Sequence, residues 1–208
     1  PSQNETLRAL LKEKDLPWNR INAFHMDEYI GLPQTSSATF GHYLAEHIFE
    51  KANFKSIHYI NASAANIEAE AARYTALLKK YPVDIVCLGV GENGHIAFND
   101  PAVADFNDSF LVKKVELDLA CRMQQVHDGC FKTLDEVPRY ALTLTVPALF
   151  SAEFMFCSVP YSTKADAIKE MLTTQHIDTH CPASILRRHP HAVLYCDKES
   201  AAKLNASI

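Results

Sequence analysis

The sequence predicts an α/β protein, a single three-layer domain built on a modified doubly wound, mostly parallel sheet that helices flank. Three observations lead to this prediction. Strand-like and helix-like segments alternate from one end of the chain to the other. The run VDIVCLGVG at residues 83–91 is apolar without period-2 alternation, as expected of a parallel strand buried on both faces. No linker, charge block or repeat divides the chain, so residues 1–208 are expected to form one domain.

The elements can be assigned in order from their patterns. Leucines at helical spacing predict a first helix over residues 2–16, with Ser2 or Asn4 as its N-cap. The first half continues with a strand at 20–26, a helix at 39–52, a strand at 56–61, a helix at 65–81 and the buried strand at 83–91. The second half repeats this rhythm less regularly, with strands at 110–117, 140–146, 153–159 and 192–196, helices at 119–131 and 164–172, and a final helix after residue 196.

Composition excludes several classes of function. The chain carries 20 Lys and Arg against 25 Asp and Glu, a net charge of −5, whereas non-specific nucleic-acid binding needs a basic face. No apolar run approaches the roughly 20 residues of a membrane span, so no membrane partner is expected. The six cysteines are scattered without a C-x-x-C motif, and the His and Cys residues do not show the paired spacing of a zinc site. We therefore expect a reduced, cytoplasmic protein without a metal or other cofactor.

Two adjacent carboxylates follow the first predicted strand, in the cluster His25-Met26-Asp27-Glu28-Tyr29. In open α/β sheets, ligands bind beyond the carboxyl ends of the strands, so side chains at these ends are candidates for function. One interpretation is a polar turn that caps the next element. The other is a carboxylate general base, whose pKa partial burial can raise toward neutrality. These residues alone leave both interpretations open.

Half of the six glycines lie in the segment GVGENGHIAFNDP at residues 89–101, directly after the buried strand. Glycines let a backbone turn sharply and approach a ligand. The motif lacks both the helix that a dinucleotide site needs and the G-K-[ST] ending of a Walker loop. A lone histidine after a strand is more often structural, but His95 has neighbours that can fix its tautomer and protonation. These neighbours are Glu92, Asn93 and Asp100.

Two predicted helix starts are candidate anion sites. Ser162–Lys164 opens a helix after a strand, and its hydroxyls, free backbone N–H groups and lysine suit a phosphate. Ser2–Gln3 at the start of the first helix is the second candidate. The alternative for both is an ordinary cap with a solvated side chain. Arg122 is a single basic residue on a segment poor in them, and we expect it at the surface unless this segment folds over a site.

Four segments, in this order, resemble the glucosamine-6-phosphate deaminase (glucosamine-6-phosphate isomerase) family. They are HMDEYIGLP, GVGENGHIAFNDP, ALTLTVPALFSAEFMFCSVPYSTKADAIKEML and CPASILRRHPHAVLYCDKESA. The resemblance covers almost the whole chain, and the first two motifs carry most of it. The related 6-phosphogluconolactonases share the glycine-rich segment but are less similar at MDEY.

The resemblance implies a role for each matching residue. Asp27 corresponds to the carboxylate that moves a proton between C1 and C2 of the open-chain sugar, and His95 to the histidine that assists opening of the pyranose ring. Lys164 corresponds to the phosphate-binding lysine, and Ser2 to the hydroxyl residue of the phosphate loop. The predicted catalytic residues are Asp27, Asn93, His95 and Asp100, with no metal. The predicted substrate-binding residues are Ser2, Gln3, Glu28, Tyr29, Gly94, Arg122 and Lys164.

Three departures from the family pattern bear on these roles. Asn93 stands where the best-known members have Asp, and Asp100 stands where they have Glu. An amide does not hold an imidazolium as a carboxylate does, so protonated His95 should be less favoured unless Asp100 or Glu92 supplies the charge. The family also has a first strand and most of a phosphate loop upstream of Ser2, so residues 1–208 are expected to lack that strand and part of that loop.

Together, these features predict a deaminating ketol-isomerase that converts glucosamine 6-phosphate to fructose 6-phosphate and ammonia. The expected partner is a small sugar phosphate; a homo-oligomer and the gluco or galacto configuration stay open. A 6-phosphogluconolactonase-like hydrolase, in which His95 acts on an ester-like ring, is the alternative among enzymes. A non-catalytic sugar-phosphate sensor is the alternative from another class. A sensor tolerates an amide in place of Asp27, whereas isomerisation needs a base there.

Overall fold

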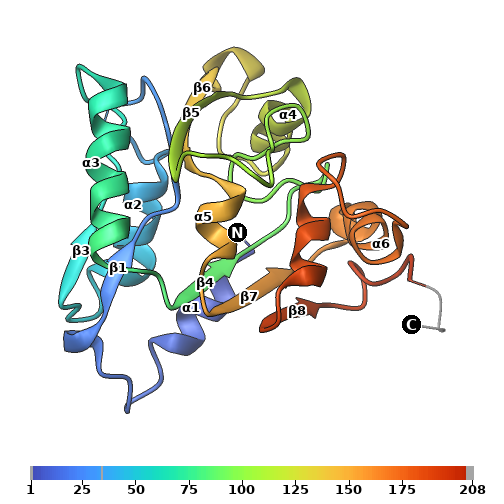
Figure 1. Cartoon of the computed structure of the whole chain (residues 1–208), viewed down its shortest axis with the longest axis horizontal. Helices are drawn as coiled ribbons and strands as arrows, with labels where there is room; N and C mark the ends of the chain where they lie inside the picture. The colour runs from blue at the N-terminus through green and yellow to red at the C-terminus, as the bar shows by residue number, and fades with distance from the viewer. Residues whose placement is uncertain (1, 34, 205–208) are drawn as a thin grey trace.

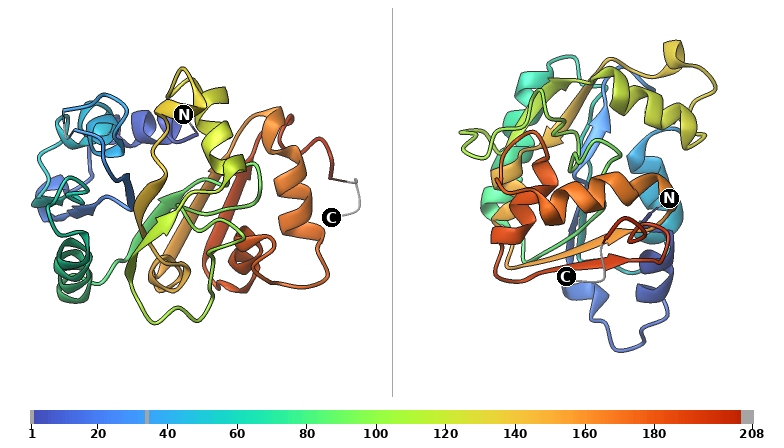
Figure 2. Two further views of the ribbon diagram at one scale, coloured as in Figure 1. Left: turned by 90° about the horizontal axis from the view of Figure 1, so that it is seen from above. Right: turned by 90° about the vertical axis from the view of Figure 1, so that its right-hand side faces the viewer.

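The computed structural model describes residues 2–33 and 35–204, and it confirms an α/β domain with mostly parallel sheets flanked by helices (Figure 1). The strands are β1 (Asn22–Phe24), β2 (Asp27–Tyr29), β3 (Ser56–His58), β4 (Ile85–Leu88), β5 (Val112–Glu116), β6 (Tyr140–Leu144), β7 (Phe154–Val159) and β8 (Ala192–Cys196). The α-helices are α1 (Asn4–Leu10), α2 (Phe40–Leu44), α3 (Ile67–Lys80), α4 (Leu119–His127), α5 (Val146–Phe150) and α6 (Ala165–Thr173). Strands β4, β7 and β8 lie between α3 at one end of the molecule and α6 at the other (Figure 2).

The strands pair in three groups. β1 pairs with β3, and β4, β7 and β8 lie side by side in the order β4-β7-β8; every pair in these two groups is parallel. β2, β6 and β5 form an antiparallel group, the exception within the mostly parallel arrangement that the sequence predicts. β5 buries Val112 in the main core cluster and Val115, which points to the opposite face of the strand, in a second cluster with Tyr29 and Phe98.

The main core cluster lies between the β4-β7-β8 group and helices α3, α5 and α6, with Tyr74, Leu88, Leu149, Met155 and Ile168 among its most buried side chains. The expectation that the strand at 83–91 is buried on both faces is wrong at its start, because Ile85 is 56% exposed. Phe154, paired with Ile85 on β7, and Tyr195 on β8 are also exposed. Within the described residues, one face of this group is therefore largely open.

The predicted final helix is also wrong for the described residues, because residues 197–204 form turns. The carboxylate of Asp197 accepts hydrogen bonds from the backbone N–H groups of Ser200 at 2.7 Å and Tyr161 at 2.9 Å, and such local bonds compete with a helix. Residues 205–208 lie outside the described residues. The helix expected at 39–52 is found as α2 continued by a π-helical turn, Ala45–Phe49. No helix of residues 2–33 and 35–204 has the length and apolar character to cross a membrane.

Candidate active site

The glycine-rich segment after β4 forms a tight loop that holds the His95 imidazole against its own backbone. A Cβ at position 91 would overlap the His95 ring, so Gly91 is required for this arrangement. The Gly91 N–H donates to the His95 carbonyl at 2.9 Å. The buried amide of Asn99 donates to the carbonyls of Ile96 and Leu144, both at 2.9 Å, and so ties the loop to the end of β6. The loop is therefore fixed from two sides.

His95 and Asp100 form a hydrogen-bonded pair, and Asn93 contacts both. The Nδ1 atom of His95 lies 3.0 Å from Oδ1 of Asp100 and 2.7 Å from Oδ1 of Asn93. The amide of Asn93 also donates to the same Asp100 oxygen at 3.0 Å. Burial raises the pKa of Asp100, but the hydrogen bonds from His95 and Asn93 outweigh it and hold that pKa below its ordinary value. The ionised Asp100 thus accepts from Nδ1–H of His95 and leaves Nε2 for a ligand.

Helix α4 packs on this pair and contributes residues that the sequence did not single out. Asp118 caps α4 by accepting from the Cys121 N–H at 2.7 Å, and its other oxygen lies 3.3 Å from the Asn93 amide nitrogen. Ligand atoms of His95, Asp100 and Cys121 lie within 4.8 Å of one another. Burial raises the pKa of the Cys121 thiol well above its ordinary value, and the charges of Asp100 and Asp118 add to this. An Asp directly before a predicted helix was the available signal, since it is a preferred N-cap.

Asp27 is the first residue of β2, and its side chain lies on the face of the β2-β6 pair that the glycine-rich loop covers. It lies opposite Thr143 of β6, whose hydroxyl accepts from the backbone N–H of Phe98 at 3.1 Å. The negative charge of Asp27 also contributes to the raised pKa of Cys121. Burial, with the charge of Glu28, raises the pKa of Asp27 to about 7. A carboxyl group with this pKa can accept and return a proton near neutral pH.

The first described residues lie at the carboxyl end of β4. A Cβ at position 89 would lie 2.8 Å from the Ser2 hydroxyl oxygen, so Gly89 gives Ser2 its space. The amide of Gln3 donates to the Leu88 carbonyl at 2.9 Å. The hydroxyl of Thr6 lies 3.2 Å from that of Ser158 on β7. Ser2 and Gln3 thus lie where β4 and β7 end, on the side from which the glycine-rich loop departs.

Lys164 is only 6% exposed at the end of the 3₁₀ turn Ser162–Lys164, which leads into α6. No hydrogen bond or ion pair joins its ammonium group to another side chain in residues 2–33 or 35–204. Burial lowers the pKa of Lys164, and the charges of Asp128 and Glu92 oppose this. Glu92 belongs to the glycine-rich loop, so the ammonium group lies on the His95 side. A buried cation without a partner indicates a place for an anionic ligand.

The structure turns the Glu28 side chain away from this cluster and packs the Tyr29 ring beside it, 5.2 Å from the ring centre of Phe98 in the glycine-rich loop. The Glu28 carboxylate accepts from the backbone N–H groups of Phe40 and Gly41, at 3.2 and 2.9 Å. The Tyr29 ring is 1% exposed and stacks on Phe40 with ring centres 5.0 Å apart. Both side chains therefore hold β2 to the start of α2. Their contact with a substrate stays a prediction from the sequence.

Arg122 and Gly94 also have structural contacts. The guanidinium of Arg122 donates to the carbonyls of Leu134 and Val137, at 2.6 and 3.0 Å, and so holds the segment after α4. Gly94 has a φ of +79°, and its carbonyl accepts from the Ala183 N–H at 2.8 Å. Arg122 is thus engaged with backbone through one guanidinium nitrogen, and its contact with a substrate stays a prediction from the sequence.

Two cavities lie apart from this cluster. One, of about 490 Å³, lies between α3 and β5. The other, of about 360 Å³, is lined by β2, α2 and the segment 59–63, and Glu28 forms part of its wall. Asp27, His95 and Lys164 line neither cavity. These three residues therefore lie near strand ends, outside the two cavities.

Comparison with known proteins places the chain among sugar-phosphate enzymes. The model of the family described as glucosamine-6-phosphate isomerases/6-phosphogluconolactonase matches residues 2–195. The glucosamine-6-phosphate deaminase of Listeria monocytogenes serotype 4a (strain HCC23) is 34% identical over 203 residues, which cover 98% of this chain and 84% of the relative. That of Bacillus cereus (strain B4264) is 32% identical over 200 residues, 96% of this chain and 74% of the relative.

Solved structures give the same fold. A structure described as a monomeric glucosamine-6-phosphate deaminase superposes with a TM-score of 0.86 at 28% identity, covering 96% of this chain and 83% of that chain. The 6-phosphogluconolactonase of Thermotoga maritima superposes with a TM-score of 0.73 at 22% identity, over 94% of this chain and 81% of that one. The second likeness supports the fold alone.

Proposed function

The chain belongs to the glucosamine-6-phosphate isomerase/6-phosphogluconolactonase family, and on that premise we propose that it is an amino-sugar-phosphate deaminase. It converts glucosamine 6-phosphate to fructose 6-phosphate and ammonia. The relatives at 32–34% identity carry the name of this activity, whereas the lactonase structures are 22% identical or less. The finer assignment therefore follows the more similar proteins.

One observation carries the proposal: Asp27 and the His95–Asp100 pair converge on the same face of the β2-β6 pair. Thr143 stands opposite Asp27 and binds the backbone of the loop that holds His95. In the proposed reaction, Nε2 of His95 assists opening of the pyranose ring while Asp100 holds Nδ1–H. Asp27 then moves the proton from C2 to C1 of the open-chain sugar, which leaves an imine at C2. Water adds to this carbon, the C2–N bond breaks, ammonia leaves, and C2 becomes the ketone of fructose 6-phosphate. A carboxyl with a pKa of about 7 suits this step, because it must both accept and return the proton.

The substrate's phosphate is assigned to Lys164 and the Ser2 hydroxyl. Lys164 supplies a buried positive charge without an internal partner, and Ser2 lies at the neighbouring strand end. A charge-assisted contact in a partly dry site is stronger than one in water, which favours a phosphorylated over an unphosphorylated sugar.

An ammonia-release assay with glucosamine 6-phosphate and galactosamine 6-phosphate, run side by side, tests the function. We expect fructose 6-phosphate and ammonia in equal amounts from the first sugar. Hydrolysis of 6-phosphoglucono-lactone above its spontaneous rate, without ammonia from either amino sugar, would instead identify a lactonase. Binding of sugar phosphates without any turnover would identify a sensor. Either of these results contradicts the proposed deaminase.

Replacing Lys164 with alanine should weaken phosphorylated ligands selectively. Loss of a hydrogen bond to a charged group costs about 1.5–3 kcal/mol, which corresponds to roughly 10- to 150-fold in KM for glucosamine 6-phosphate or in Kd for a sugar-phosphate inhibitor. Binding of unphosphorylated glucosamine should change little. Lys169→Ala, which removes an exposed lysine from the same helix, is the matched control. Equal weakening of phosphorylated and unphosphorylated ligands by Lys164→Ala would rule out the phosphate role.

A further inference from the structure

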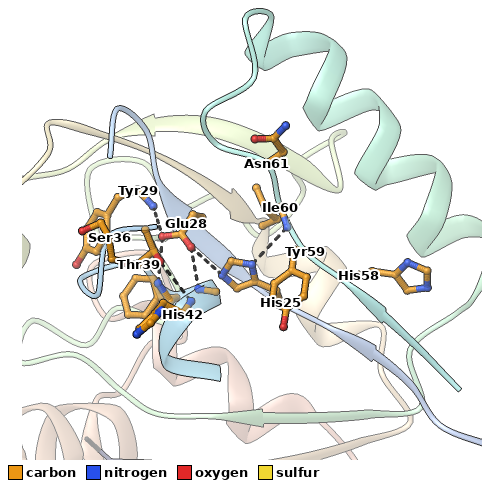
Figure 3. A network of polar contacts seen from close by, with 12 residues as sticks. His25, Glu28, Tyr29, Ser36, Thr39, His42, His58, Tyr59, Ile60 and Asn61 are labelled. Carbon is orange, nitrogen blue, oxygen red and sulfur yellow. Dashed lines mark hydrogen bonds and ion pairs between the residues drawn. The ribbon is translucent and has the colours of Figure 1, made fainter. Parts of the chain in front are cut away.

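Glu28 is a buried carboxylate that the proposed reaction does not use. Successive residues of a strand point to opposite faces, so the side chains of Glu28 and Asp27 lie on either side of β2. Glu28 is 5% exposed, and its oxygens accept from the backbone N–H groups of Tyr29, Phe40 and Gly41 at 2.9, 3.2 and 2.9 Å (Figure 3). Three backbone donors from two segments fix this carboxylate in place and favour its ionised form, but burial outweighs them, so the pKa of Glu28 lies above its ordinary value.

His25 lies against Glu28 without neutralising it. Its Nε2 atom is 3.5 Å from Oε2 of Glu28, and its Nδ1 atom accepts from the Ile60 N–H at 3.3 Å (Figure 3). Nδ1 therefore carries no proton, and the proton of the neutral ring is on Nε2, facing Glu28. Burial lowers the pKa of His25 to about 4. At neutral pH His25 is therefore a neutral imidazole, which does not cancel the charge of the ionised Glu28 carboxylate.

The other titratable groups around Asp27 are neutral or paired. Burial raises the pKa of Tyr29 on β2, of Tyr74 on α3 and of Cys121 on α4 above their ordinary values, so all three are uncharged near neutral pH. Lys113 of β5 stands in register with Asp27 across Thr143, but its ammonium group is bound to Asp108 at 2.7 Å. Asp100 and Asp118 also carry negative charge on this side, but Asp100 is bound to His95 and Asp118 accepts from the Cys121 N–H. Glu28 is the charged residue adjacent to Asp27 on β2 itself.

We infer that Glu28 is a positioning residue for Asp27: its fixed negative charge, held across β2, favours the protonated form of Asp27, and its hydrogen bonds fix the strand that carries Asp27. The inference rests on the proposed function, because Asp27 is the proton carrier there. A like charge close by disfavours ionisation of a carboxyl group. In agreement, the charge of Glu28 adds to burial in raising the pKa of Asp27. Glu28 thus acts on the reaction through Asp27.

The test is a carboxyl titration of the full chain followed by NMR, with ¹³C-labelled aspartate and with Asp27→Asn to assign the Asp27 signal. Glu28→Gln keeps the size of the side chain and one acceptor oxygen but removes the charge. We expect the titration midpoint of Asp27 to move to lower pH in Glu28→Gln, and the acid limb of kcat/KM for glucosamine 6-phosphate to move with it. A midpoint equal to that of the parent protein would overturn the inference.

Glu70→Gln is the matched control. Glu70 is also buried, accepts from the backbone N–H of Asn61 at 2.6 Å and binds Arg73, but it lies on α3 rather than beside Asp27. The Glu70→Gln variant should leave the titration midpoint of Asp27 unchanged. An equal shift in both variants would indicate a non-specific change in the structure and would contradict a specific role for Glu28.

A second measurement needs no variant of Glu28. In the parent protein, the Asp27 signal should show a second inflection at the pH where Glu28 titrates, because interacting groups titrate as a pair. A single-step curve would contradict the coupling. Both NMR readouts work without turnover, so failure of the inference and failure of the deaminase proposal give different results.

Discussion

Asp27→Asn is expected to lower kcat for glucosamine 6-phosphate by about 10²–10⁴-fold, the range typical for loss of a general base. Asparagine has nearly the same shape but cannot accept the proton from C2. Affinity for the substrate should change far less, because the phosphate is held elsewhere. Steady-state kinetics of ammonia release will measure both quantities. Asp166→Asn, an exposed carboxylate on α6, is the control and should leave kcat unchanged. Activity of Asp27→Asn within twofold of the parent would remove Asp27 from the reaction.

The same variant makes a second, independent prediction about stability. The pKa of Asp27 is raised from 3.8 to about 7 in the folded chain, so the folded state holds this proton more tightly than the unfolded state does. The stability that the protonated group contributes is complete below about pH 4 and is lost as pH rises to about 7. The parent should therefore lose up to about 4 kcal/mol relative to Asp27→Asn across this window. Denaturant unfolding at pH 4 and pH 8 will measure the difference, and a constant difference would contradict the raised pKa.

The fold could be predicted from the sequence where periodicity is strong and length is sufficient. The helix at 65–81 and the strands at 153–159 and 192–196 are found at nearly the expected bounds, as α3, β7 and β8. The three-residue strand β2 is too short to show a period. The helix α5 is five residues of mixed apolar type that follow a strand directly, so its pattern could not be separated from the strand's. Strand direction depends on contacts far apart in the chain, so local patterns do not show which strands form the antiparallel group.

The candidate site was predictable where a residue follows a strand, and less so where its contacts come from another element. Asp27 and His95 both follow predicted strands, and the structure places them on one face. Glu28 is adjacent to Asp27 in the sequence, but β-strand alternation sends its side chain to the other face. Cys121 reaches His95 only because α4 packs over the loop, and no local pattern shows this.

Asp100→Asn is expected to reduce kcat by at least about 10²-fold, although Asp100 touches no substrate, because it disturbs the acid–base function of His95. The ionised Asp100 accepts from Nδ1–H of His95. An asparagine can instead present its amide N–H to Nδ1, which moves the ring proton to Nε2 and removes the lone pair that faces the ligand. His95 then cannot accept a proton during ring opening. The kinetics of ammonia release measure this loss, and NMR of ¹⁵N-labelled histidine reports the tautomer.

The variant should also lose stability in a defined pH window. The folded-state pKa of Asp100 lies below its ordinary value of 3.8, so its stabilising contribution is present above pH 4 and is lost as pH falls through the lower, folded-state value. The free energy of unfolding of Asp100→Asn should be about 1.5–3 kcal/mol lower than that of the parent at pH 7, and this difference should become smaller at acid pH. An equal gap at pH 7 and pH 3 would show that the loss comes from packing instead.

A double variant tests whether the carboxylate must stand at position 100 or only needs to lie beside Nδ1 of His95. Asn93 contacts both His95 and Asp100, and its side-chain oxygen is 2.7 Å from Nδ1 of His95, so a carboxylate at position 93 can hold the same proton. Asn93→Asp combined with Asp100→Asn therefore exchanges the two groups and restores a carboxylate beside Nδ1, while the new amide at position 100 can donate to it. We expect the exchange to recover most of the activity that Asp100→Asn loses and to return the ring proton to Nδ1. Recovery of neither would show that Asp100 serves the reaction through something other than its charge beside His95.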